Sequence, residues 1–235
     1  MGAERIGTER SRSPGRPRLT APQRSGVTAR EEILDAAAEL FTSEGYASVS
    51  TRKIAELAGF RQASIYHYFD SKEDVLTALL GQTVDVALSL ADRLAGRAEP
   101  AHVRLYALAH SDSAQLGSGK WNLGALYLLP ELRGERFAAF HAKRVALRER
   151  YEALALEAAA ESGSPLGLCR LPFRLVESVI IARGDVADDP ELACAQGMPP
   201  DLVAEAVLRM LGRQGSFEPV RAQALALLAT LDEQA

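Results

Sequence analysis

The sequence contains little cysteine and no long apolar run, and both absences narrow what the protein can be. Its two cysteines, Cys169 and Cys194, are too few for a disulfide framework, and we interpret them as free thiols in a reducing compartment. No apolar run approaches the roughly 18 residues that a membrane-spanning helix needs. The N-terminal segment is polar and rich in arginine, without the apolar core of a secretory signal. These features predict a cytoplasmic protein.

The sequence also lacks the short motifs that mark common enzyme sites. It contains no Gly-x-Ser-x-Gly, no phosphate-binding loop and no His-Glu-x-x-His. Three of its histidines, His102, His110 and His141, belong to no set with metal-ligand spacing, and a structural role is favoured for each. We therefore expect no catalytic residues, no metal and no cofactor.

Charge is distributed unevenly along the chain, although the net charge is only -4. Residues 1–30 hold seven arginines against two glutamates, whereas residues 73–235 hold 16 basic and 22 acidic side chains. A basic N-terminal arm on an acidic body suggests that one end of the protein meets a polyanion. Residues 1–27 mix Pro, Gly, Ser and Arg without periodicity, so we expect a flexible basic arm there.

After residue 27 apolar residues recur at helical spacing, and no stretch alternates with period two for long enough to form a strand. Thr28 with Glu31 and Ser71 with Asp74 match the capping-box pattern that opens a helix. The sequence therefore predicts an all-α fold, with a first helix ending before Gly45. Further helices are expected near residues 51–58, 62–69, 72–95, 100–116, 121–128, 135–162, 172–184, 200–212 and 219–232.

The stretch Ser50–Lys72, STRKIAELAGFRQASIYHYFDSK, predicts two short helices joined by a turn at Gly59. This is the geometry that places a recognition helix in the major groove of DNA. A plain solvent-facing surface is the alternative, but clustered aromatic side chains and the basic arm upstream weigh against it. Side chains suited to base edges are Arg52, Arg61, Gln62, Ala63, Ser64 and Tyr66. Those suited to phosphates are Thr51, Tyr68 and Lys72.

Residues 28–80 resemble the DNA-binding domain of the TetR family of bacterial transcriptional regulators, most specifically in AGFRQASIYHYFDSKEDVL. The resemblance implies base contacts from Arg52, Gln62, Ala63 and Tyr66. It implies phosphate contacts from Thr51, Ser64, His67 or Tyr68, and Lys72. Arg61 stands where the family usually has a helix-capping residue, so a weaker cap is expected on the recognition helix. The arm's SPGRPRLT also resembles minor-groove-binding arms, with a non-specific arm as the alternative.

The same resemblance implies three parts: the arm at 1–27, a helix-turn-helix domain at 28–72, and a ligand-binding and dimerisation domain at 73–235, with 73–95 as its connecting helix. Apolar cavities with a few polar groups are typical ligand sites, although each candidate could equally be plain core. Candidate ligand-binding residues are Tyr106, His110, Trp121, Leu126, Tyr127, Phe137, Phe140 and His141. Candidate dimer-interface residues, for which packing within one chain is the alternative, are Phe173, Val176, Ile180, Leu202, Val203, Val207 and Met210.

The function favoured by these features is that of a ligand-responsive regulator, most simply a repressor. It would bind a palindromic operator on double-stranded DNA as a homodimer, and a small, largely apolar effector would release it. The alternative is a constitutive architectural DNA-binding protein whose large domain only dimerises. The sequence leaves open the effector, the operator, and the choice between repression and activation.

Overall fold

The computed structural model describes residues 28–188 and 198–234, and these residues form helices and no strands. The predicted all-α fold is confirmed. The predicted arm at 1–27 and Cys194 lie outside the described residues. The α-helices are α1 (Ala29–Ser43), α2 (Thr51–Leu57), α3 (Gln62–Ile65), α4 (Lys72–Leu94), α5 (Ala101–Ser118), α6 (Ala138–Ser162), α7 (Pro172–Asp188), α8 (Pro200–Met210) and α9 (Glu218–Asp232).

Short 3₁₀ segments connect several of these helices. They are η1 (Tyr46–Ser48), η2 (Leu123–Leu128), η3 (Pro130–Arg133), η4 (Glu135–Phe137) and η5 (Leu166–Arg170). The segment 121–128, predicted as a helix, is therefore a 3₁₀ turn whose backbone is extended again at Leu129. The segment predicted as one helix over 135–162 begins with η4 before α6 starts.

The capping signals place the first helices where the sequence predicts them. The Thr28 hydroxyl accepts from the Glu31 N–H, and the Glu31 carboxylate accepts from the Thr28 N–H at 2.9 Å, which completes the capping box of α1. At α4 the Ser71 hydroxyl accepts from the Asp74 N–H at 3.2 Å and donates to the Asp74 carboxylate. The bond from the Asp74 N–H is the N-cap bond of a capping box. The second bond differs from that motif, because the Asp74 carboxylate accepts from the Ser71 hydroxyl and not from the Ser71 backbone N–H.

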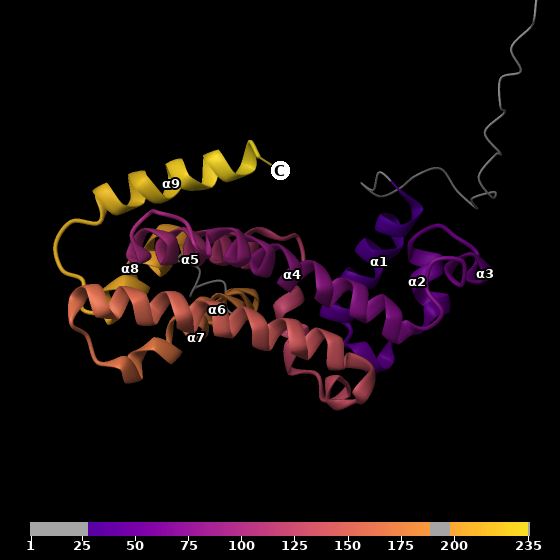
Figure 1. Ribbon diagram of the computed structural model, residues 1–235. Helices are drawn as coiled ribbons and strands as arrows, with labels where there is room; N and C mark the ends of the chain where they lie inside the picture. Colours follow the sequence, from indigo (N-terminus) through magenta and orange to yellow (C-terminus); the bar gives the residue numbers. More distant parts are fainter. Residues whose placement is uncertain (1–27, 189–197, 235) are drawn as a thin grey trace, which may run out of the picture.

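Helices α1 to α3 close around a small core at one end of the molecule (Figure 1). Ile33, Ile54 and Ile65, one from each helix, are fully buried there. Gly59 has φ of 76°, a left-handed conformation that glycine adopts without steric cost, and it turns the chain from α2 into α3. Phe60 follows it and is buried, so the turn is anchored in this core.

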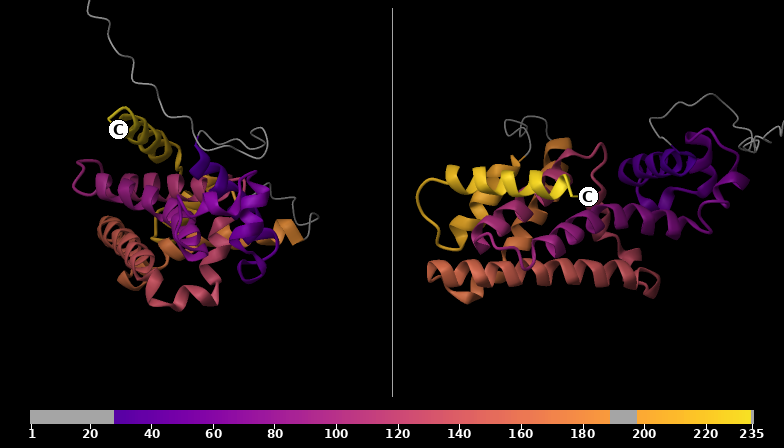
Figure 2. Two further views of the ribbon diagram at one scale, coloured as in Figure 1. Left: turned by 90° about the vertical axis from the view of Figure 1, so that its right-hand side faces the viewer. Right: turned by 45° about the horizontal axis from the view of Figure 1, so that its top comes forward.

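Helix α4 carries the chain from this unit into the larger domain (Figure 2). It is long and apolar enough to cross a membrane by length and composition alone. Half of that stretch is buried inside the protein, as in a core helix of a globular fold. Its buried side chains, such as Leu76 and Leu80, pack within the continuous core of the molecule.

The larger domain is built around α5, which contacts α4, α6, α7, α8 and α9. Val103, Leu105 and Leu108 on this helix are fully buried, as expected for a helix covered on several sides. Helix α9 lies on the outside of α5 (Figure 1) and buries Val220 and Leu227. The C-terminal part of α4 is therefore packed within this helical bundle.

Candidate DNA-binding surface and regulatory pockets

Helices α2 and α3 bring three predicted DNA-contacting residues together on one exposed face. The Thr51 hydroxyl lies 3.3 Å from the Tyr66 hydroxyl, and Gln62 Nε2 lies 3.5 Å from Thr51 Oγ1. Tyr66 keeps 49% of its surface exposed although a buried position would stabilise an aromatic ring. An amide and a phenol held side by side in this way form a hydrogen-bonding surface of the kind that reads base edges.

Helix α3 exposes its first two side chains, Gln62 and Ala63, to solvent. The consecutive residues Arg61, Gln62 and Ala63 are exposed to solvent. Ile65 is the buried residue that holds the helix against the core. Arg61 occupies the N-cap position and makes no side-chain capping bond, so the expectation of a weaker cap is confirmed. Ser64 is partly exposed, and His67 and Tyr68 are exposed just beyond the helix. The structure thus gathers these predicted contacts at one end of the molecule.

Two predicted DNA-contacting residues already have protein partners. Arg52 is paired with Glu56 one turn along α2 at 2.8 Å, with both side chains exposed. Lys72 donates from Nζ to the carbonyls of Tyr46 and Val49, at 2.9 Å each, and its ammonium lies 4.1 Å from the Tyr46 ring centroid. Lys72 therefore ties the start of α4 to the connection between α1 and α2. These contacts give Lys72 a structural role, and its phosphate contact stays a prediction.

The predicted ligand-binding residues do not share one pocket. Tyr106 and His110 belong to a link between helices α5, α8 and α9: the Tyr106 hydroxyl donates to Asp201 at 3.2 Å, and His110 Nε2 lies 3.3 Å from the same carboxylate. Arg221 pairs with Asp201 from α9. Burial raises the pKa of Tyr106 to about 12 and lowers the pKa of His110. These groups hold helices together.

A second set of predicted ligand-binding residues is part of the core. Leu126, Phe137 and Phe140 are each less than 5% exposed and pack in the core, and contact with a ligand stays a prediction for them. Tyr127 packs on Phe140 with ring centroids 5.4 Å apart, and its hydroxyl is hydrogen-bonded to Thr83. His141 Nε2 lies 2.7 Å from the carbonyl oxygen of Leu132, and because a carbonyl only accepts, the imidazole N–H is the donor. His141 thus stabilises the turn before α6.

Three of the predicted ligand-binding residues line pockets, each a different one: His110, Trp121, and Tyr127, which borders a pocket of about 260 Å³ next to Gly124 and Ile180. Trp121 is half-buried, and it lines a pocket of about 170 Å³ with Gln82, Thr83, Gln115, Leu116, Gly119, Leu123, Gly124 and Arg183. Its Nε1–H donates to Asp35 Oδ1 on α1 at 2.8 Å. The partner stands 86 residues earlier in the chain, and periodicity gives no signal that would reveal it.

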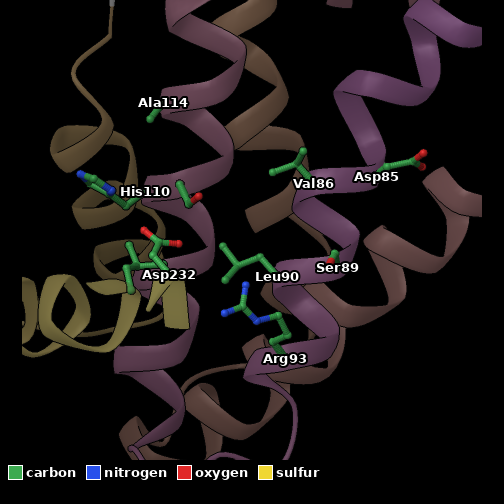
Figure 3. A pocket seen from close by; sticks show the side chains of 10 residues that line it. Asp85, Val86, Ser89, Leu90, Arg93, His110, Ala114 and Asp232 are labelled. Atoms are coloured by element: carbon green, nitrogen blue, oxygen red, sulfur yellow. The ribbon is translucent and has the colours of Figure 1, made fainter. Parts of the chain in front are cut away.

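A larger, more open hollow of about 510 Å³ lies between α4, α5 and α9 (Figure 3). Val86, Leu90 and Arg93 reach it from α4, His110 and Ala114 from α5. The Arg93 guanidinium is engaged by the carbonyl of Leu231 near the end of α9. Of the predicted ligand-binding residues, only His110 reaches this hollow.

Most of the predicted dimer-interface residues lie inside the single chain. Phe173, Val176, Val203 and Val207 are each less than 5% exposed, and Ile180 packs so closely on Gly124 that a Cβ there would lie 2.5 Å from it. The expectation that these side chains form an exposed patch in a monomer is wrong, because the other helices already cover them. Leu202 is 57% exposed and Met210 is partly exposed.

The outward faces of α7 and α8 carry other apolar side chains. Ile181 on α7 is 63% exposed, and Leu171, the residue just before α7, is 44% exposed. Of the predicted interface residues, Leu202 lies on the outward side of α8, whereas Val176 on α7 and Val203 and Val207 on α8 face the interior. On these two helices and the residue before α7, the exposed large apolar side chains in the described part of the chain are Leu171, Ile181 and Leu202.

One buried acid had no place in the sequence-based expectations. Asp112 on α5 is almost completely buried and accepts from the Tyr151 hydroxyl at 2.9 Å. Burial raises the pKa of Asp112 to about 7, and nearby Glu177 adds to that effect. Among the described residues no group of three or more His, Cys, Asp and Glu side chains could hold a metal ion.

Known proteins share both the sequence of the DNA-binding unit and the helical fold. Residues 33–79 match the family described as "Bacterial regulatory proteins, tetR family". The crystal structure of Mycobacterium smegmatis AmtR is 52% identical, has a TM-score of 0.82, and the match covers 89% of this chain and 98% of that chain. A tetR-family regulatory protein from Rhodococcus RHA1 has the same fold at 21% identity, with a TM-score of 0.64 over 81% of this chain and 100% of that chain.

A curated relative matches about a quarter of this chain. The transcriptional repressor KstR2 of Rhodococcus jostii is 43% identical over 56 residues, which make up 24% of this chain and 28% of KstR2. The likeness to AmtR, in contrast, extends over nearly the whole of both chains. The chain therefore belongs to the TetR family of bacterial regulatory proteins, and it is a DNA-binding regulator of transcription and not an enzyme.

Proposed function

We propose that this protein is a cytoplasmic repressor that binds a palindromic operator as a homodimer and is released by a small molecule. The observation that carries the proposal is the exposed surface formed by Thr51, Gln62 and Tyr66. It lies at the far end of α4 from the bundle that contains the pockets (Figure 2). That separation suits a protein in which one end reads DNA and the other end responds to a ligand.

The DNA-binding unit, residues 28–72, would lay α3 in the major groove. Gln62 can pair with adenine, Tyr66 can pack on a thymine methyl, and the small Ala63 allows close approach. Arg61 and Arg52 are exposed cations within reach of guanine or phosphate, Arg52 with its Nε engaged by Glu56. Thr51, Ser64, His67 and Tyr68 would contact phosphates.

Dimerisation would bury the outward faces of α7 and α8. Leu171, Ile181 and Leu202 expose large apolar side chains on these helices, and covering them would remove apolar area from water. A twofold arrangement would apply the same faces of both subunits to each other. The two recognition helices would then meet half-sites about one turn of DNA apart, roughly 34 Å, so the operator would be an inverted repeat.

Release by an effector would act within the domain formed by residues 73–235. Its pockets border α4, the helix that leads directly to the DNA-binding unit. A ligand that prefers a different position of α4 would lower DNA affinity by its differential affinity for the two states. A constitutive architectural protein would show no such coupling.

Selection of bound sequences from a random DNA pool tests this proposal. We expect an inverted repeat, bound by two subunits, from which a metabolite extract displaces the protein. Sequences without twofold symmetry would refute the homodimeric operator complex. An inverted repeat that no extract fraction releases would instead favour the architectural function.

A further inference from the structure

Arg52 and Glu56 form an ion pair on the exposed side of α2, and its geometry leaves the tip of the guanidinium free. Arg52 Nε donates to Glu56 Oε1 at 2.8 Å. The Nη1 and Nη2 groups of Arg52 have no hydrogen-bond partner among residues 28–188 and 198–234. Because these two groups carry the N–H donors at the end of the side chain, the end remains available to a ligand.

The pair lies next to the exposed surface formed by Thr51, Gln62 and Tyr66. Arg52 directly follows Thr51 at the start of α2, and the Thr51 hydroxyl lies 3.3 Å from that of Tyr66. Both members of the pair face solvent, with 74% of the Arg52 side chain and 60% of the Glu56 side chain exposed. Exposed pairs one helical turn apart contribute little to stability. Stabilising the fold is therefore a minor effect of this pair.

Other cations of the DNA-binding unit are held differently. Lys53 Nζ is paired with Glu44, and Lys72 Nζ donates to two backbone carbonyls. The ammonium groups of these two lysines are thus already engaged. Arg61 is exposed and forms no ion pair with any described residue, so no carboxylate orients it. Arg52 differs from all three, because a carboxylate fixes its side chain while the donors at its end stay free.

The free donors of Arg52 match the acceptors of one base. In the major groove guanine presents N7 and O6 side by side, and a bidentate contact from arginine to these two atoms is the commonest specific contact with a base. The planar guanidinium supplies two parallel N–H groups for such a contact. Glu56 occupies Nε, so the approach that uses Nε is closed and the approach through Nη1 and Nη2 remains.

We propose that Glu56 is a positioning residue for base recognition, which holds Arg52 through Nε so that its two Nη groups donate to N7 and O6 of a guanine in the major groove. The inference rests on the proposed function, in which α2 and α3 face the operator. It names one base of each half-site and the residue that sets its recognition. Arg52 contacts the base, and Glu56 acts through Arg52.

The carboxylate of Glu56 has two effects of opposite sign on DNA binding. It repels the phosphates of any DNA, which lowers affinity for all sequences alike. It also orders the Arg52 side chain before DNA arrives, which removes part of the entropy that a long side chain loses on binding. That gain appears only where Arg52 binds guanine. Glu56 therefore lowers affinity for random DNA and raises the preference for guanine at one base pair.

The test measures base preference, on the full-length protein and its selected operator at one salt concentration. Arg52→Ala should remove a preference for guanine of roughly 5–150-fold at one base pair of each half-site, which identifies that base pair. Glu56→Ala should lower the same preference roughly 2–10-fold, the range for ordering one long side chain, while affinity for random DNA rises. Glu56→Gln keeps an acceptor for Nε without the charge, so it should raise affinity for random DNA and keep most of the preference.

Glu44→Gln is the matched control, because it removes an acid of the same unit that is paired with Lys53 and not with Arg52. It should raise affinity for random DNA and leave the guanine preference unchanged. In an Arg52→Ala background, Glu56→Ala should change no base preference.

Two results would overturn the inference while the proposed function stands. One is an inverted repeat whose base preferences are the same with and without Arg52. The other is a guanine preference that Glu56→Ala lowers no more than Glu44→Gln does. If the variants behave as expected on a selected sequence without twofold symmetry, the proposed function fails and the role of Glu56 stands.

Discussion

Lys72 offers a test of whether a basic residue next to the recognition helix serves the fold or the DNA. Its ammonium donates to two backbone carbonyls, those of Tyr46 and Val49, and lies over the Tyr46 ring. Hydrogen bonds from charged groups contribute about 1.5–3 kcal/mol each when buried, and a cation–π contact about 0.5–1 kcal/mol at exposed sites. Because Lys72 is only partly buried, we discount the sum to about 2–3 kcal/mol.

The substitution Lys72→Met keeps the aliphatic chain and removes the ammonium. We expect urea unfolding to show a loss of about 2–3 kcal/mol in the free energy of unfolding. Lys143→Met is the matched control, because Lys143 pairs with Asp85 with both side chains about half exposed, and such pairs contribute about 0–1 kcal/mol. The dependence of random-DNA affinity on salt should be unchanged in folded Lys72→Met. Normal stability with a salt slope lowered by about one unit would show instead that Lys72 contacts a phosphate.

Three further predictions concern other parts of the molecule. Tyr66→Ala should weaken operator binding by about 1–3 kcal/mol, measured by fluorescence anisotropy, through loss of a base contact. Ile181→Asp should give a monomer by light scattering, whereas Leu156→Asp on the exposed side of α6 should leave the dimer intact; a dimer in both would exclude the α7 interface. Asp112→Asn should raise the free energy of unfolding above pH 7. The buried carboxyl has a pKa of about 7 in the folded state, well above its usual value, so the protonated form stabilises the fold fully below about pH 4. That stabilisation is lost as the pH rises to 7. Urea unfolding between pH 4 and 8 measures this, and a wild-type stability that does not fall over that range would contradict it.

The helix-turn-helix unit could be predicted in detail because local chemistry determines it. Thr28 and Glu31 satisfy the first N–H groups of α1 through neighbouring residues, and Gly59 permits the one turn that needs positive φ. The exposed residues of α3 follow from its single buried position, Ile65. Signals of this kind lie within a few residues of each other, so one sequence is enough to read them.

The larger domain could be predicted only as a set of helices. Val176 and Val207 look like interface residues because their helices have wide apolar faces, but the face that other helices cover is decided by packing over long distances. Phe140 and Tyr127 pack on each other, and Tyr127 also lines a pocket of about 260 Å³, so aromatic content alone does not separate core residues from pocket residues. The Asp35–Trp121 contact joins residues 86 positions apart and carries no local pattern.

The central claim is that α3 reads DNA sequence, and Gln62 tests it most directly. The measurement compares dissociation constants of the unsubstituted protein and Gln62→Ala for the selected operator and for random DNA of equal length, at one salt concentration. We predict that operator affinity falls roughly 5–150-fold, equivalent to about 1–3 kcal/mol, while affinity for random DNA stays the same. Equal losses on both DNAs, or no loss on either, would contradict the assignment of α3 as the recognition helix.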